Sequence, residues 1–432
     1  MIARLIVTDL VAGWRTWLGA FVVLVLSGVV ALVCAGDVST ASAMGDTEQA
    51  AALANHAKIY AGMNAPVVIG GVAVLVGFVV RSQRTRHALW QFAGLTPRLV
   101  AAVVLGQVAT VALLTLGVAA LVVVPFLDLL LNGLSGPVRS DPDVALVTVT
   151  LAPGPVAVAA LVHIGTAVVS AAVAARRAAR TPALHAVRAP ADETTRPGVA
   201  RLVVALLLGL GATAMYAAYL LGDQGLSSMF AIVFVASAAC AAPWLVAPLL
   251  RAWTALVPAR SRTTWFLARR AALHSVSRSQ ASVTLVTVAA ALGAFTGSIG
   301  LWNDPRMFFQ GLALFGVPVA VVLVTAVMTV FMTAPERRRE TAALVVAGVT
   351  WRSAALAAGL EGLISVVTAG VLALVLALPS TVSPFVGQVP LDAVRPLPWV
   401  LLIGAVLLVS ASVAPVLTAR RHTLVAELRV PA

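Results

Sequence analysis

Ten long apolar stretches run through this 432-residue chain, and they constrain its fold more than any other feature. A helix needs about 20 apolar residues to cross the roughly 30 Å hydrocarbon core of a lipid bilayer. Only 10% of the residues are charged, whereas soluble domains average about 25%. We therefore expect an all-α integral membrane protein with about ten transmembrane helices. The stretches lie at 17–37, 61–80, 100–125, 153–175, 202–221, 228–250, 281–301, 311–333, 354–378 and 397–418.

The basic residues fall almost entirely on one side of this predicted arrangement. If the N-terminus is cytoplasmic, all 29 Lys and Arg residues except Lys58, Arg139, Arg306 and Arg395 lie in cytoplasmic segments. An excess of Lys and Arg marks the cytoplasmic loops of membrane proteins. We expect a multi-pass protein of the cell (plasma) membrane with both termini in the cytoplasm. Because the positive charge is spread over many short loops, it indicates contact with anionic membrane lipids and no nucleic-acid partner.

The chain also repeats itself. Residues 84–125 align without gaps with residues 338–379, which begin 254 positions later. In each copy a basic loop leads into a long apolar helix, and such a duplicated membrane unit is more typical of a transporter than of a simple anchor. The aligned pairs include Arg84 with Arg338, Ala88 with Ala342, Gly94 with Gly348, Thr96 with Thr350, Arg98 with Arg352, Gln107 with Glu361 and Pro125 with Pro379.

The repeat predicts the organisation of the whole chain. Each copy contains four spans, so both copies enter the membrane in the same direction and form parallel four-helix repeats. The first repeat covers residues 1–188 and opens with a stretch, 1–14, that has the character of an interfacial helix. The second repeat covers residues 263–432. The interval 189–262 holds a polar linker at 189–198 and a central pair of transmembrane helices.

The loop after the second span of each repeat carries the sharpest functional signal. Residues 336–344 are good helix formers, and Gly348 suits the left-handed turn that ends a helix. Trp351 and Arg352 follow, as expected at a membrane surface. A short rigid helix between two spans would act as a lever on which a partner docks. The alternative is a solvated loop that only obeys the charge rule, but the recurrence of the turn in the first copy favours the lever.

The second copy resembles the signature of FtsX-like permeases, the family of the MacB-type and lipoprotein-releasing ABC transporter subunits. The resemblance lies in the run Arg338-Arg339-Glu340-Thr341-Ala342-Ala343-Leu344, in Ala347-Gly348-Val349-Thr350 and in Glu361. It implies a permease whose short cytoplasmic helices dock on two copies of a separate ABC ATPase subunit. The docking residues that it implies are Glu336, Arg338, Arg339, Glu340, Gly348 and Arg352 in the second copy, and Arg84, Arg86, Gly94 and Arg98 in the first.

The residues themselves also place ATP binding on another chain. Lys58 is the only lysine and follows an alanine, whereas a P-loop needs Gly-Lys followed by Ser or Thr to reach the phosphates. Cys34 and Cys240 lie within predicted spans, and the six His residues show no metal-ligand spacing. We therefore expect no enzymatic activity and no cofactor or metal in this chain, and a partner ATPase that supplies the energy.

Departures from the family pattern shape the expected mechanism. Arg86 stands where the second copy has Glu340, and Gln107 stands where it has Glu361, so the two docking sides are expected to be unequal. Members of the family often carry a large extracytoplasmic domain between the first two spans of a repeat. Here the corresponding loops, predicted at 40–60 and 302–310, are short. Recognition then falls to the spans, which favours export of a lipophilic or amphipathic substrate.

Three polar residues lie inside predicted spans. Glu361 and its counterpart Gln107 are either functional groups or architectural hydrogen bonds between helices, and the resemblance favours architecture for Glu361. His163 is expected to be a neutral histidine bonded to a neighbouring helix, with a proton relay as the alternative.

Two other functions stay open. One is a non-transporting, signalling member of the same family, and the short external loops argue against it. The other is a secondary transporter driven by an ion gradient. Its major-facilitator signature, Gly-x-x-x-Asp-Arg, is missing from the loop between spans two and three, Arg81–Arg98.

Overall fold

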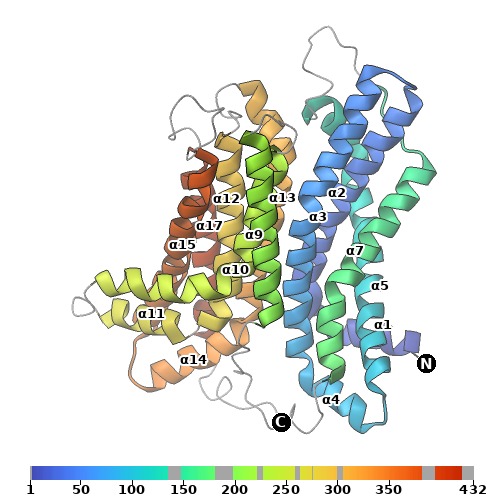
Figure 1. Cartoon of the computed structure of the whole chain (residues 1–432). Coiled ribbons are helices and arrows are strands. Elements are labelled where there is room, and N and C mark those ends of the chain that lie inside the picture. The colour runs from blue at the N-terminus through green and yellow to red at the C-terminus, as the bar shows by residue number, and fades with distance from the viewer. Residues whose placement is uncertain are drawn as a thin grey trace. The chain divides into compact units, whose positions relative to one another are not determined.

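The chain folds into helices. The computed structural model describes residues 2–134, 147–180, 198–220, 227–257, 263–274, 276–298, 305–381 and 395–420. Within these ranges no strand is present (Figure 1), and nine helices are long and apolar enough to cross a membrane. The predicted class, an all-helical membrane protein, is confirmed at this level. The nine candidate spans are Trp14–Ala43, Glu48–Ser82, Pro97–Asn132, Pro153–Arg177, Arg201–Ala218, Val233–Leu256, Phe315–Met332, Trp351–Leu376 and Pro396–Ala419.

The remaining predicted span, 281–301, is also helical where the structure describes it. It falls on α12 (Val276–Ser298), whose apolar part, Ser279–Ala294, is shorter than the nine candidate spans. Residues 299–301 of the predicted span lie outside the described residues. The number of spans is therefore nine among the described helices, with α12 as the position of the expected tenth.

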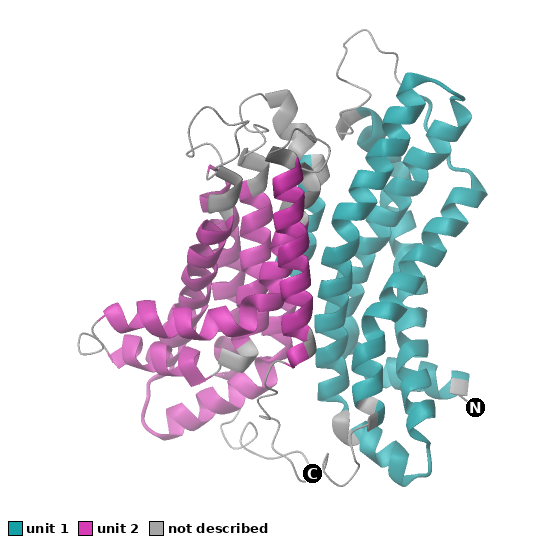
Figure 2. Cartoon of the chain, viewed as in Figure 1, with its two compact units in different colours: residues 1–193, 303–324 teal, residues 194–302, 325–432 magenta. Residues whose placement is uncertain are grey.

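The helices group into two compact units (Figure 2). Unit 1 comprises residues 1–193 with 303–324, and unit 2 comprises 194–302 with 325–432, so that α13 (Pro305–Met332) contributes to both. The predicted repeat boundaries stay a prediction, and the predicted linker lies outside the described residues except for Gly198. Unit 1 contains α1 (Ile2–Ala12), α2 (Trp14–Ala43), α3 (Glu48–Ser82), α4 (Arg84–Phe92), α5 (Pro97–Val123) and α7 (Pro153–Arg180). Unit 2 contains α9 (Val199–Leu220), α10 (Ser227–Leu256), α11 (Thr263–His274), α12, α14 (Ala334–Val346), α15 (Trp351–Thr381) and α17 (Pro396–Ala419).

Small residues let the long helices of each unit pack closely. In unit 1, α2 packs against α3, α5 and α7, and a methyl group at Gly28 would lie 2.9 Å from the Ala119 side chain of α5. In unit 2, α15 packs against α12 and α17, and a methyl group at Gly362 would lie 3.3 Å from the Val409 backbone. Such contacts suit membrane helices, because van der Waals packing replaces the hydrophobic drive that lipid removes.

Two predicted loops were wrong. Most of residues 40–60 do not form a loop, and residues 305–310 of the predicted loop 302–310 belong to α13, whereas 302–304 lie outside the described residues. The α2 helix continues to Ala43, and α3 begins at Glu48 after a Thr47 cap, whose side chain accepts a hydrogen bond from the Ala50 amide at 3.1 Å. The first turns of α3 are amphipathic, with polar residues on the exposed face. A search for continuous apolar runs therefore could not detect them.

Candidate functional site

The two short helices expected between spans are present. In unit 1, α4 joins α3 to α5, and in unit 2, α14 joins α13 to α15. In Figure 1 each lies just beyond the lower ends of the long helices that it joins. We call α4 and α14 the lever helices. The prediction of a helix over 336–344 is therefore confirmed, and α14 extends it by two residues at each end.

Both lever helices end in the same turn. Gly94 and Gly348 have φ angles of 93° and 97°, in the left-handed region that side chains disfavour. The residue after each glycine donates a backbone hydrogen bond five residues back, Leu95 to Trp90 and Val349 to Leu344, both at 3.0 Å. This pattern is a Schellman motif, which turns the chain sharply away from the helix. The left-handed turn predicted from the sequence is therefore confirmed in both copies.

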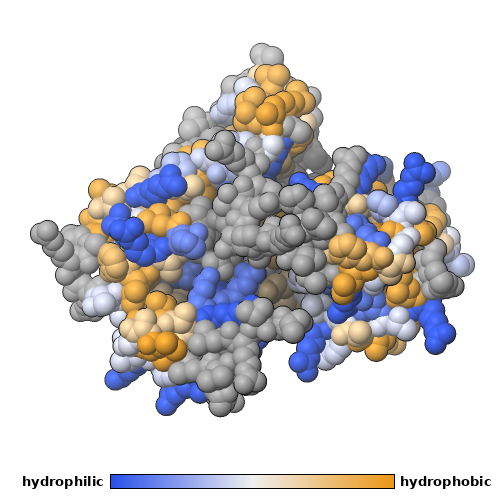
Figure 3. All heavy atoms as spheres, turned by 90° about the horizontal axis from the view of Figure 1, so that it is seen from below, coloured by the Kyte–Doolittle hydropathy of each residue, from blue (hydrophilic) through white to orange (hydrophobic). Residues whose placement is uncertain are grey.

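The lever helices expose both charged and apolar side chains. Phe92 at the end of α4 is 59% exposed, and its counterpart Val346 at the end of α14 is 63% exposed. Figure 3 shows the end of the molecule that carries the levers, where hydrophobic patches lie beside hydrophilic ones. The backbone of Arg84 lies in α4, and its side chain is outside the described residues. Among the predicted docking residues, Glu336, Arg339, Glu340, Gly348, Arg352, Gly94 and Arg98 are exposed, whereas Arg338 and Arg86 are half-buried.

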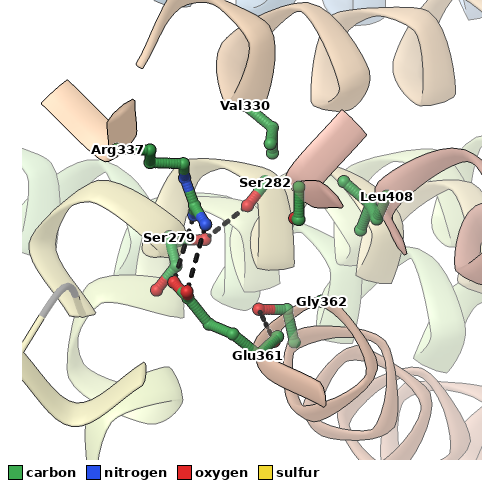
Figure 4. A pocket seen from close by; sticks show the side chains of 9 residues that line it. Ser279, Ser282, Val330, Arg337, Glu361, Gly362 and Leu408 are labelled. Atoms are coloured by element: carbon green, nitrogen blue, oxygen red, sulfur yellow. Dashed lines mark hydrogen bonds and ion pairs between the residues drawn. The ribbon is translucent and has the colours of Figure 1, made fainter. Parts of the chain in front are cut away.

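In unit 2, an ion pair ties the lever to the next span. Arg337 of α14 donates from Nη1 to Glu361 Oε2 at 3.0 Å and from Nη2 to Glu361 Oε1 at 3.1 Å. The two side chains are only 14% and 10% exposed. Figure 4 shows the pair inside a small pocket, to which α12 contributes Ser279 and Ser282 and α15 contributes Gly362. Bidentate pairs of this kind fix both distance and orientation.

In unit 1, the lever α4 is also linked to the next long helix, α5, at the position that aligns with Glu361, but through different residues. Gln107 of α5, the counterpart of Glu361, donates from Nε2 to Asp9 Oδ2 at 2.7 Å. Arg86 of α4 donates from Nη1 to Asp9 Oδ1 at 2.6 Å. The carboxylate therefore comes from α1 and bridges the lever to the span. Gln83, which aligns with Arg337, bonds instead to Thr16 Oγ1 at 3.3 Å.

Sequence reasoning missed the two residues that complete these links. Arg337 was read as one member of a basic run, and Asp9 was not singled out. A usable signal existed for Asp9, because it is the only acid in the otherwise apolar and basic stretch 1–36. Its burial, with only 7% of the residue exposed, shows that the carboxylate needs internal partners.

The buried His163 binds two neighbouring helices. Its Nε2 lies 3.2 Å from the Ala112 carbonyl oxygen of α5, and its Nδ1 lies 3.1 Å from the Ser27 hydroxyl of α2. A carbonyl oxygen only accepts, so Nε2 carries a hydrogen, and Nδ1 accepts from Ser27 in the neutral ring. Both ring nitrogens are therefore occupied, as expected of a histidine that joins helices.

The lever helix α4 also buries a histidine that the sequence did not single out. His87 is 3% exposed, and neither of its ring nitrogens has a hydrogen-bond partner. Its ring lies 5.2 Å from that of Trp90. Burial lowers the pKa of His87 below its usual value, nearby Arg86 lowers the pKa further, and the Asp9 charge raises it in part. The ring is thus held neutral at the base of the lever.

These side chains form no site for a metal. Among the residues that the structure describes, no three His, Cys, Asp or Glu side chains gather to hold an ion. The sequence matches no protein-family model and no curated protein.

Proposed function

We propose that this chain is the membrane (permease) subunit of an FtsX-like ABC transporter, which uses ATP hydrolysis by a separate subunit to export a lipophilic or amphipathic substrate. The observation that carries the proposal is the pair of lever helices. Each follows a long helix, ends in the same left-handed glycine turn and is linked by a buried carboxylate to the helix that comes next. A force applied to either lever would reach a membrane-spanning helix through these links.

The proposed architecture has two parallel four-helix repeats. The first consists of α2, α3, α5 and α7, and the second consists of α12, α13, α15 and α17, with α9 and α10 as the central pair. The close packing of α2 with α3, α5 and α7, and of α15 with α12 and α17, supports the grouping of these helices. The helix α13 is assigned to the second repeat by its place in the sequence, because its two ends fall in different units. With α12 counted, ten helices cross the membrane, and both termini are cytoplasmic.

The surface of the levers suits an ATPase partner. Helix-in-groove contacts need a few exposed apolar anchors surrounded by polar groups. Phe92 and Val346 supply the anchors, and Arg339 and Glu340 supply exposed charge about two turns before Val346 on the same helix. Because the only lysine of the chain lacks the P-loop context, ATP binding belongs to the partner.

An apolar groove supports a lipophilic substrate. It runs along α15 and α17 in unit 2 and has a volume of about 490 Å³. Its walls include Val367, Gly370, Leu374, Leu401 and Leu402, and none of the lining residues that the structure describes is polar or charged. A small hydrophilic solute would find no side-chain hydrogen-bonding partner there, whereas an acyl chain or a hydrophobic ring system would pack against these apolar side chains.

Two observations bear on the other candidate functions. The in-membrane groups Glu361 and His163 already have partners on both oxygens and both nitrogens, which argues against a proton or ion relay. A signalling role, in contrast, gains support from the lengths of α2 and α3, which have 30 and 35 residues. At about 1.5 Å per residue these helices exceed a roughly 30 Å hydrocarbon core and offer surface beyond it.

The first experiment is purification of the chain from native membranes in mild detergent, with mass spectrometry of the proteins that co-purify. A P-loop ATPase in stoichiometric amount is the expected partner. Glu340→Lys and Gly348→Pro should release it, because the first reverses an exposed charge of the lever and the second is incompatible with a φ of 97°. The matched control is Asp46→Lys, which reverses an exposed charge in the short α2–α3 connection.

A transport measurement completes the test. In vesicles that contain the purified complex, ATP should drive movement of a fluorescent lipid or hydrophobic dye. Transport of a small hydrophilic solute instead would contradict the substrate class. Absence of any ATPase across several detergents would contradict the whole proposal and return attention to an ion-gradient mechanism.

A further inference from the structure

The first helix, α1, has one buried face and one exposed face. The buried face carries Asp9. The exposed face carries Arg4, Val7 and Val11, which are spaced by three and four residues and therefore lie along one stripe, and it continues into the exposed Trp14 at the start of α2. An exposed helix side that combines apolar and cationic residues, with no acid, suits the interface of a membrane, where the long arginine side chain reaches the headgroups.

The connection to α2 holds this helix at the membrane surface. Only Gly13 separates the end of α1 from Trp14, where a candidate span begins. In Figure 1, α1 lies across the lower part of unit 1, at a large angle to the long helix α5. Arg15 lies over the Trp14 ring, 5.8 Å from its centre, and Trp and Arg side chains are typical residues of the membrane–water interface. The short connection to α2 and the interfacial side chains Trp14 and Arg15 therefore both place α1 at the membrane surface.

The buried face of α1 is seated on the span and the lever together. A methyl group at Gly106 of α5 would lie 2.5 Å from the Ile6 side chain, so that the two helices touch there. One residue further along α5, Gln107 holds Asp9, which also holds Arg86 of the lever helix α4. A movement of α1 therefore reaches the lever through the Asp9 carboxylate.

We propose that α1 binds the anionic lipid surface of the membrane and that Asp9 transmits the position of α1 to the lever helix α4. The proposal rests on the proposed function for the lever role of α4 and for the cytoplasmic side of α1. It assigns the expected contact with anionic lipids to one helix, α1, and it assigns Asp9 as a positioning residue. The first docking side of the transporter thereby responds to lipid charge.

Unit 2 provides an internal control for this proposal. There Arg337 of the lever pairs directly with Glu361 of α15, with no bridging carboxylate between these two side chains. The position of the α14 lever should therefore not depend on lipid charge. Phe92 and Val346 occupy equivalent, similarly exposed positions on the two levers and suit matched probes.

The test uses spin labels in the full chain after replacement of Cys34 and Cys240 by alanine. A label at Phe92→Cys reports on α4, one at Val346→Cys reports on α14, and one at Val7→Cys reports on the membrane depth of α1. Each single-label chain is placed in nanodiscs of phosphatidylcholine alone or with phosphatidylglycerol. Each arginine close to an anionic surface strengthens binding by roughly fivefold. Anionic lipid should therefore move the Val7 label into the membrane and remove the mobile component of the spectrum of the Phe92 label. The spectrum of the Val346 label should not change.

Variants separate surface binding from transmission. Arg4→Gln with Arg15→Gln should remove the lipid response at both Val7 and Phe92 without touching Asp9. Asp9→Ala should leave the Val7 response intact but abolish that of Phe92. Adding Gln83→Arg and Gln107→Glu to Asp9→Ala copies the unit 2 pair into unit 1. This chain should regain an immobile Phe92 label that no longer depends on lipid.

Two results would overturn the proposal. A Val7 label that stays in water on anionic nanodiscs excludes surface binding. A Phe92 label indifferent to lipid charge, while the Val7 label inserts, excludes transmission through Asp9. None of these measurements needs an ATPase or a substrate, so a failure of the proposed transport function is recognised separately, by the co-purification experiment.

Discussion

Arg337 of α14 holds Glu361 of α15 with both of its terminal nitrogens, at 3.0 and 3.1 Å, in a pocket that α12 and α17 close. The pair joins a helix outside the candidate spans to the interior of one. Because the pair is largely buried, neither charge can exchange its partner for water without a large free-energy cost.

Removing one member of this pair should destabilise the protein strongly. Glu361→Ala leaves the Arg337 charge buried and unpaired, and breaking such pairs costs about 3–5 kcal/mol. The double variant Arg337→Met, Glu361→Leu removes both charges and should recover most of the lost stability. Thermal unfolding of the detergent-solubilised variants gives the double-mutant cycle. Additive losses in the double variant would show that the two side chains act independently.

The lever turns should tolerate asparagine better than other side chains. At Gly94 and Gly348 the left-handed backbone penalises a β-carbon by roughly 1–2 kcal/mol, and asparagine visits this region more readily than most residues. Gly348→Ala should therefore lower the unfolding temperature, and Gly348→Asn should lower it less.

Gly77→Ala in α3 is the matched control for the turn variants, since its new methyl group meets open space in a regular helix. It should be neutral or slightly stabilising, because alanine favours helix more than glycine does. An equal loss at Gly77 and Gly348 would rule out the turn as the cause.

The packing of α4 against the other helices of unit 1 (the docked state of α4) should weaken in acid. The pKa of His87 is lower when α4 is packed and the ring is buried than when α4 is released into water, so the docked state binds fewer protons. Docking is therefore fully stabilised above the undocked pKa of about 6.5 and is lost progressively as the pH falls below it toward the lowered value. Accessibility of a cysteine at Phe92 to a water-soluble reagent, measured from pH 8 to pH 5, should rise in acid.

The second repeat supplies the control for this pH dependence. Thr341 occupies the position equivalent to His87 and donates to the Arg337 carbonyl oxygen at 2.8 Å. His87→Thr should make α4 insensitive to pH, and a cysteine at Val346 on α14 should show no change over the same range. A rise in accessibility that persists in His87→Thr would point to another titrating group.

His163 should be needed for packing and dispensable for energy coupling. His163→Leu removes both hydrogen bonds and leaves the Ser27 hydroxyl unpaired, which costs about 1–3 kcal/mol. His163→Gln keeps one donor and one acceptor and should retain most of the stability. Once a substrate is in hand, its ATP-driven transport per folded molecule should be the same in His163→Gln and the unmodified chain. A selective loss of transport in a stable variant would instead indicate a proton relay.

The sequence predicted the features that depend on local chemistry. The left-handed turns at Gly94 and Gly348 follow from one residue type at a helix end, and the lever helix over 336–344 follows from helix-forming residues. The long apolar helices follow from hydropathy. The start of α3 was missed because its apolar face is interrupted by polar residues, which a continuous apolar run excludes.

The links between helices needed the three-dimensional structure. Glu361 and Gln107 stood out as polar residues in apolar stretches, but nothing in the sequence says which arginine or carboxylate faces them. That choice depends on how far each helix is rotated about its axis. Arg337 therefore remained hidden among its neighbours Arg338 and Arg339, and Asp9, 98 positions before its partner Gln107, had no visible counterpart.

The two carboxylates have different sources in the two aligned segments. In unit 2 the acid lies within the repeated segment itself, whereas in unit 1 it lies upstream of that segment, on α1. Asp9 is therefore coupled by direct contact to Arg86, and Arg337 to Glu361. A chain assembled from two copies of the second aligned segment would keep a left-handed glycine turn at both positions, but its first lever would no longer be joined to α1 through Asp9.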